Sequence, residues 1–297
     1  MIRPAWTLKS SICRTWSDSV ADVSGIDLIQ AYQWEKTMSD QISNITGSPA
    51  EKLAGDFGFT EGPLWHPDGY WLFVDIQSSK IHKMSTSGQL EAFRDPSFGT
   101  NGMTFDKQGN MVICESDNRQ IMRRQAEGSY TAIATHADGK RLNRPNDIVG
   151  RSDGSLYFTD PGGRLTDAER ELDFSGVHII APDGSQSVGT TETEYPNGLA
   201  FSPDEKIFYV AITRLDSRCL EEKEKKQVCE HQLIRAFDVA PDGSLSNNRV
   251  FANMHSAEDG VPDGMKVDVE GNVYCTGPEG VWVFDASGTH LGTIILP

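Results

Sequence analysis

Five short segments of the chain begin with a side chain that can donate an oxygen atom to a metal ion. They start 40 to 66 residues apart, and each leads directly into an apolar run. The first residues of the five segments are Glu61, Asn101, Asn146, Asn197 and Asp263. Carboxylate and amide oxygens suit Ca²⁺ or Mg²⁺, and the lack of His and Cys at these positions disfavours Zn²⁺ and Cu²⁺. If the five starts converge, they form a site for a hard cation.

Each position also has an ordinary explanation when it is taken alone. Asn-Gly and Asp-Gly are common turn pairs, and Glu61 by itself would be a surface carboxylate. All five residues stand at the same position of the repeated unit, and this coincidence weighs against the ordinary explanation. In addition, the apolar run follows each residue immediately, so the pair precedes a strand and does not connect a hairpin.

The elements that position these residues read as β-strands. From about Glu51, runs rich in Val, Ile, Phe and Tyr alternate with turns of Gly, Asp, Pro and Ser. Four runs per unit predict an all-β fold, a β-propeller. The first strand of each blade lines the central channel, so the five starts would meet at one mouth. The ends of the second strands reach the same mouth, at Asp75, Glu115 and Asp160.

Five units are recognisable, and a sixth is missing or must come from the first 50 residues. We predict two regions: an atypical N-terminal segment over 1–50 and the propeller over 51–297. Ile26–Met38 could form a short helix, and the longer spacings predict loop insertions at Gly162–Ser175 and Arg214–His231.

Composition excludes several classes of function. The chain has 297 residues and a net charge of −16, which argues against nucleic-acid binding but not against a cation or a neutral sugar. The chain contains no run of 18 apolar residues, so no membrane span is predicted. Residues 1–16 lack the continuous apolar core of a secretory signal, so a cytoplasmic protein is expected. The oligomeric state is left open.

The five cysteines give no metal-binding pattern. Cys114 and Cys275 lie in strand-like runs and are expected to be small core residues. Cys219 and Cys229 bracket a charged stretch that a disulfide could close, although two free thiols are favoured for a cytoplasmic chain.

Arg144 lies two residues before Asn146 and could hold a substrate hydroxyl or carboxylate; a solvated loop arginine is the equal alternative. The motifs of serine hydrolases, zinc proteases, P-loop proteins and EF-hands are absent.

Five motifs resemble the gluconolactonase/regucalcin (senescence marker protein) family, over about Lys52 to Pro297. The segments that carry the resemblance are Phe59–Trp65, Arg141–Asp147, Ser152–Pro161, Tyr195–Asp204 and Val261–Met265.

The resemblance implies a six-bladed propeller that holds one divalent metal, usually Ca²⁺, although family members also accept Mg²⁺, Mn²⁺ or Zn²⁺. It implies metal ligands at Glu61, Asn146, Asn197 and Asp263. Arg144 would contact substrate, and Asn101 would contact substrate or water, with Glu115 and Asp160 as further substrate-binding candidates. Asp263 would be the general base.

The chain departs from the family pattern at both ends. Family members continue past the position of Pro297 to complete blade six with an N-terminal strand such as Glu51–Gly55. An incomplete or atypical last blade is therefore expected.

The leading hypothesis is a metal-dependent hydrolase of a small sugar-type lactone. One alternative is the same scaffold recruited for another metabolite conversion. The other is a calcium-binding or interaction propeller without catalysis, whose last blade a partner strand could complete.

Overall fold

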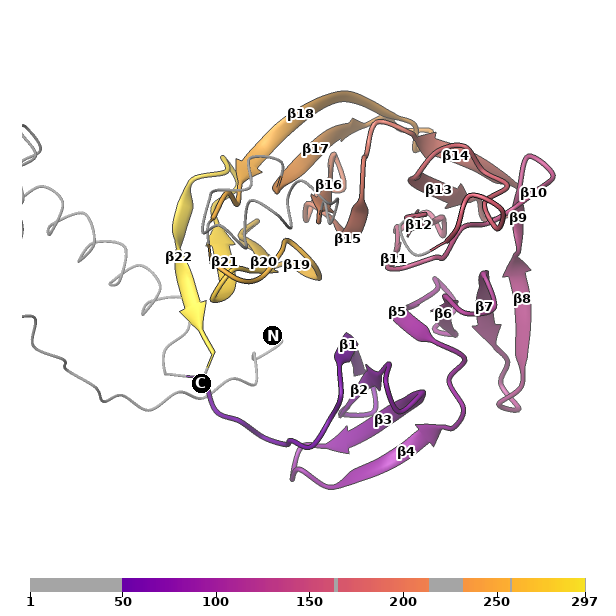
Figure 1. The fold of residues 1–297 in the computed structure, drawn as a ribbon, viewed down its shortest axis with the longest axis vertical. Helices are drawn as coiled ribbons and strands as arrows, with labels where there is room; N and C mark the ends of the chain where they lie inside the picture. Colours follow the sequence, from indigo (N-terminus) through magenta and orange to yellow (C-terminus); the bar gives the residue numbers. More distant parts are fainter. Residues whose placement is uncertain (1–49, 163–164, 214–231, 257, 297) are drawn as a thin grey trace, which may run out of the picture.

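The computed structural model describes residues 50–162, 165–213, 232–256 and 258–296. These residues form five antiparallel four-stranded sheets, each built from strands in consecutive order. The sheets stand around a common centre like the blades of a propeller (Figure 1), and the first strand of each sheet lies nearest that centre. The all-β propeller predicted from the repeat is thereby confirmed.

The strand bounds follow the repeat. The first blade contains β1 (Thr60–His66), β2 (Tyr70–Asp75), β3 (Lys80–Ser85) and β4 (Leu90–Arg94). The second contains β5 (Thr100–Phe105), β6 (Met111–Glu115), β7 (Gln120–Arg124) and β8 (Tyr130–Ala134). The third contains β11 (Ile148–Gly150), β12 (Leu156–Asp160), β13 (Gly176–Ile180) and β14 (Gln186–Thr190). The fourth contains β15 (Pro196–Phe201), β16 (Ile207–Ile212), β17 (Leu233–Val239) and β18 (Leu245–Asn253). The fifth contains β19 (Met265–Val267), β20 (Val273–Gly277), β21 (Gly280–Phe284) and β22 (His290–Ile295).

A small hairpin, which the repeat does not predict, precedes the third blade. It pairs β9 (His136–Ala137) with β10 (Lys140–Arg141). Asp138 and Gly139 connect them, both with positive φ, 49° and 76°, as a two-residue hairpin turn requires. The hairpin leads the chain to Arg144 and Asn146.

Apolar side chains pack between consecutive blades. One buried cluster lies at each junction from the first blade to the fifth, and the cluster between the second and third blades includes Cys114, Ile148 and Phe158. A strand in a middle blade is covered on both faces, so all five residues of β6 are buried. The inner strand β1 of the first blade carries three exposed residues in seven, because no blade covers its outward face.

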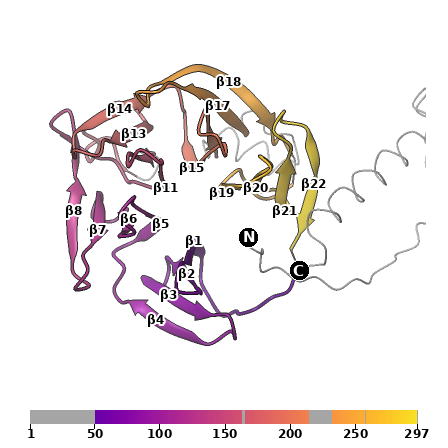
Figure 2. The ribbon, with the colours of Figure 1, turned by 180° about the vertical axis from the view of Figure 1, so that it is seen from behind.

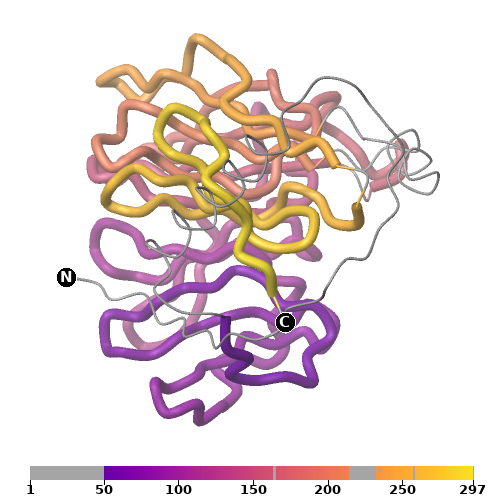
Figure 3. Tube along the Cα trace, turned by 90° about the vertical axis from the view of Figure 1, so that its left-hand side faces the viewer, coloured from indigo at the N-terminus to yellow at the C-terminus, as the bar shows by residue number. Residues whose placement is uncertain are grey.

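The arc of blades is open between β22 and β1 (Figures 1 and 2). Residues 50–59 cross this sector without forming a strand, and the chain at residue 50 lies beside the end of β22 (Figure 3). The predicted count of six blades is therefore not confirmed: the described residues form five, and Glu51–Gly55 pairs with no strand among them.

Cys114 and Cys275 are buried free thiols, as expected. The predicted helix over Ile26–Met38, the pair Cys219 and Cys229, and the insertion Arg214–His231 lie outside the described residues. Nowhere in the described part of the chain does a helix have the length and apolar character needed to cross a membrane.

Candidate active site at the inner strand starts

The five oxygen-bearing starts lie side by side at the inner edge of the arc. The N–H of Gly102 donates to the carbonyl of Asn146 at 2.7 Å, and the N–H of Gly198 donates to the carbonyl of Asp263 at 3.1 Å. These bonds join inner strands of successive blades, so residues far apart in the sequence share one rim.

Glycine follows four of the five starts, and at three of these positions, Gly62, Gly102 and Gly198, neighbouring backbones approach closely. A Cβ atom at Gly62 would lie 2.2 Å from the carbonyl oxygen of Asn101, and one at Gly198 would lie 2.2 Å from that of Asp263. A Cβ at Gly264, in contrast, would have no atom of the described residues within 4 Å, and no described blade follows the fifth blade, to which Gly264 leads. The turn explanation of the Asn-Gly and Asp-Gly pairs is therefore wrong for Gly198, which is needed for close approach.

Glu61 and Asp263 bring two carboxyl groups together from the first and last blades. Burial, the charges of Asp263 and Asp147 and a hydrogen bond with Asp263 together raise the pKa of Glu61 to about 8, although a hydrogen bond from the backbone N–H of Gly62 lowers it. Two carboxylates in a desolvated site repel each other unless a proton or a cation lies between them. The pair therefore favours a cation electrostatically.

The carboxamides complete an all-oxygen donor set. Asn101 and Asn146 are half-buried, and Asn197 donates its Nδ2 to Oγ1 of Thr213 at 2.9 Å, which leaves its Oδ1 facing away from that hydroxyl. The described residues contain no group of three or more His, Cys, Asp or Glu side chains arranged to hold a metal. Two carboxylates with two carboxamides nevertheless fit a hard cation, whose ligands are oxygens of either kind.

Two of the predicted substrate contacts, Glu115 and Asp160, are buried and already accept hydrogen bonds within the protein. The carboxylate of Glu115 is 1% exposed and accepts hydrogen bonds from Arg94, Asn118 and Gln120 at 2.6, 2.8 and 2.7 Å. This carboxylate secures the turn after β6. A substrate contact at Glu115 stays a prediction that this geometry does not favour.

Asp160 is likewise buried, and its Oδ2 accepts the N–H of Asn143 at 2.8 Å. The Nδ2 of Asn143 in turn donates to the carbonyls of Asp160 and Phe174. Together these bonds anchor the segment that carries Arg144 and Asn146. The geometry thus favours a supporting position for Asp160, behind the rim.

Arg144 reaches the carboxylate of Asp117 on the turn after β6, with Nη2 to Oδ1 at 2.6 Å. Its side chain is 26% exposed, so the guanidinium keeps open donors toward solvent. A bound molecule with hydroxyl or carboxylate oxygens could be held by these donors.

The sequence patterns did not single out Asp147, which occupies the place that glycine holds in the other four starts. Burial raises its pKa, whereas Lys266 and the backbone N–H groups of Ile148 and Leu199 lower it. Its carboxylate thus bridges the inner strands of the third and fourth blades. The aspartate in place of the expected glycine was the signal in the sequence that could have identified this residue.

Asp75 fixes the chain just before Glu61. Its carboxylate accepts the N–H groups of Gly58 and Phe59 at 3.2 and 3.0 Å. Burial alone would raise the pKa of Asp75, but hydrogen bonds from Phe59, Ser78 and Gly58 outweigh it and lower the pKa to about 2.

Asp75→Asn is expected to lower the free energy of unfolding at pH 7 by about 2 kcal/mol, since 1.36 kcal/mol corresponds to one pKa unit. The folded pKa is below the ordinary value of 3.8, so the carboxylate stabilises the fold above about pH 4, and this contribution is lost as the pH falls toward 2. Urea unfolding at several pH values measures it. The exposed turn variant Asp183→Asn is the control, and an equal loss of stability in the two variants would contradict the prediction.

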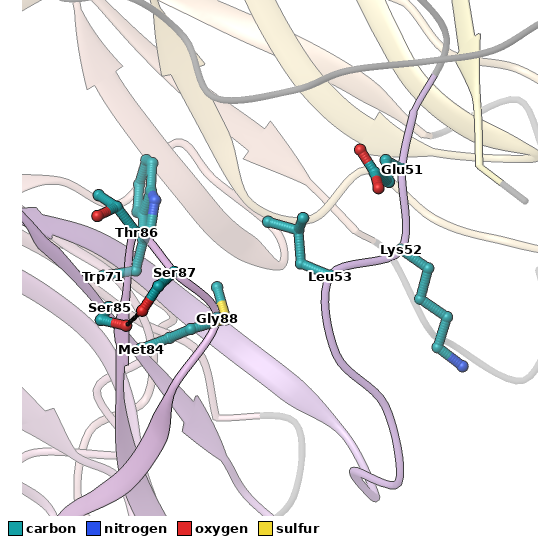
Figure 4. A pocket seen from close by; sticks show the side chains of 9 residues that line it. All are labelled: Glu51, Lys52, Leu53, Trp71, Met84, Ser85, Thr86, Ser87 and Gly88. Carbon is teal, nitrogen blue, oxygen red and sulfur yellow. Dashed lines mark hydrogen bonds between the residues drawn. The ribbon is translucent and has the colours of Figure 1, made fainter.

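A pocket of about 240 Å³ lies apart from the rim, between residues 51–53 and the turn that follows β3 (Figure 4). Leu53 points toward that turn, and Lys52 points away from it. The pocket contains none of the five strand starts and is therefore separate from the candidate site.

A β-propeller with carboxylates and carboxamides gathered at its inner rim is the class that fold and site define. Within this class, the chain belongs to the SMP-30/Gluconolactonase/LRE-like family, whose model matches residues 59–297. The resemblance inferred from the motifs is thereby confirmed.

Three of the similar proteins are named as lactonases. A gluconolactonase of Zymomonas mobilis is 29% identical over 86% of this chain and 74% of its own length. A pentonolactonase of Haloferax volcanii is 28% identical over 80% of this chain and 73% of its own. Among solved structures, a gluconolactonase of Xanthomonas campestris is 33% identical, with a TM-score of 0.71 over 82% of this chain and 78% of that one. These relatives support the predicted enzyme class, a lactonase.

Proposed function

We propose that the protein is a metal-dependent hydrolase that opens a small sugar-type lactone. The observation that carries the proposal is the contact between the carboxyl groups of Glu61 and Asp263 at the rim of oxygen donors. The gluconolactonase and pentonolactonase relatives supply the substrate class.

Glu61, Asn146, Asn197 and Asp263 would hold one divalent cation, with Ca²⁺ preferred for its tolerance of mixed carboxylate and carbonyl ligands. Such a cation would act as a Lewis acid that polarises the lactone carbonyl and stabilises the negative charge developing on its oxygen.

Asp263 would act as the general base and remove a proton from the attacking water. The water oxygen bonds to the carbonyl carbon, the ring C–O bond breaks, and the proton passes to the departing ring oxygen, which gives the hydroxy acid. Arg144 and Asn101 would orient the hydroxyl groups of the ring, so that the carbonyl faces the water.

Exhaustive chelation is expected to abolish turnover of a panel of aldonolactones, and added Ca²⁺ is expected to restore it, because the carbonyl is no longer polarised without a cation. A pH-stat assay of acid release, with and without chelator, measures this. Buffer without enzyme corrects for spontaneous lactone opening.

Undiminished turnover after chelation would contradict the proposed mechanism. If calcium bound but no lactone in the panel were opened, the scaffold would serve another conversion or a non-catalytic role.

A further inference from the structure

Thr213 follows β16 and is 6% exposed. Its hydroxyl donates to the carbonyl oxygen of Pro262 at 2.6 Å, and its oxygen accepts the Nδ2–H of Asn197 at 2.9 Å. Pro262 directly precedes Asp263. One hydroxyl therefore touches the side chain of one proposed metal ligand and the backbone beside another.

The direction of these two bonds is determined. A threonine hydroxyl has one proton, and a carbonyl can only accept, so the proton is committed to Pro262. The lone pairs of the hydroxyl oxygen then face Asn197, and only the amide NH₂ group can pair with them. A flipped carboxamide would set two acceptors against each other in a buried place, at a cost of about 1–3 kcal/mol for the unsatisfied group. The Oδ1 atom of Asn197 is thus held away from Thr213.

We propose that Thr213 is a positioning residue, which fixes the carboxamide of Asn197 with its oxygen presented to the cation. The inference rests on the proposed function, because it assigns a role toward the same metal. Thr213 touches no reacting atom itself. Its effect passes through Asn197, since an amide nitrogen offers no lone pair to a cation whereas the oxygen does.

A second hydroxyl provides a matched comparison. Ser116, just after β6, donates to the carbonyl of Pro145 at 2.5 Å, and Pro145 precedes Asn146 as Pro262 precedes Asp263. Both hydroxyls therefore tie the second strand of one blade to the inner strand of the next. Within the described residues, however, the Ser116 hydroxyl bonds to no side chain of the proposed ligand set.

Titration calorimetry with CaCl₂ alone tests the role of Thr213 without relying on activity. Thr213→Val keeps the side-chain volume but frees the amide, so the affinity for Ca²⁺ is expected to fall about 10- to 100-fold, as is usual when a residue that orients a ligand is lost. Thr213→Ser keeps the hydroxyl and is expected to stay within about 3-fold of wild type. Ser116→Ala removes the comparable hydrogen bond to Pro145. This variant is expected to lose thermal stability but to change calcium affinity by less than about 3-fold.

Wild-type calcium affinity in folded Thr213→Val would overturn the inference, as would an equal loss in Ser116→Ala. If Thr213→Val does not fold, Thr213→Cys takes its place. A thiol accepts hydrogen bonds poorly, so at least about 5-fold weaker binding is expected, and unchanged binding would overturn the inference. Absence of calcium binding in the wild type would instead contradict the proposed metal site itself.

Discussion

Replacing Asp263 by alanine is expected to reduce kcat/KM for lactone hydrolysis by at least about 10³-fold, because general-base catalysis alone contributes about 10²- to 10⁴-fold. The variant is also expected to bind calcium more weakly, since one of two carboxylate ligands is lost. Asp263→Asn separates the two roles. It retains an oxygen donor but has no base, so hydrolysis should be lost as in the alanine variant while calcium affinity falls less.

Initial rates at saturating Ca²⁺, together with calorimetric affinities, measure both effects. Asp242→Ala, which removes a carboxylate on the exposed turn after β17, is the control and should retain wild-type turnover. Full activity in Asp263→Ala would contradict the assignment of the base.

Gly198→Ala is expected to be among the most damaging small substitutions. The added Cβ would lie 2.2 Å from the carbonyl oxygen of Asp263 and 2.8 Å from the backbone nitrogen of Met265. Two inner strands would have to separate, at a cost of about 1–3 kcal/mol or more for overpacking. Asn197 and Asp263 would move apart with them, so lactone turnover should fall at least about 10-fold.

Gly264→Ala is the matched control, because its Cβ would meet no described atom within 4 Å. Thermal unfolding and turnover of both variants, compared with wild type, distinguish close packing from a general intolerance of side chains after the starts. Equal damage in the two variants would show that close approach is not the reason for the glycine.

Much of the fold could be predicted from the sequence, because each blade repeats a local pattern. The predicted pattern of four apolar runs per unit, beginning near Glu51, agrees with the four strands found in each of the five blades. Apolar alternation between turn residues determines such strands locally. The hairpin of β9 and β10 was missed, although its Asp138-Gly139 pair was a signal.

The site was less predictable, because its details depend on contacts between blades. A common repeat phase was enough to bring Glu61, Asn197 and Asp263 to one rim. Sequence spacing does not reveal that the Glu115 carboxylate is held by its own turn, since a side chain at the end of a strand can point either way. The Thr213 bridge requires two blades to be in register, which no local pattern encodes.

The contact between Glu61 and Asp263 joins the two ends of an open arc, 202 positions apart in the sequence. A cation bound there would act as a clasp, holding the first and last blades together without a covalent link. Because it would bind only the folded arc, it would raise resistance to unfolding in proportion to the logarithm of its concentration. The free energy of unfolding would then depend on the concentration of the ion, through the same site that carries the proposed chemistry.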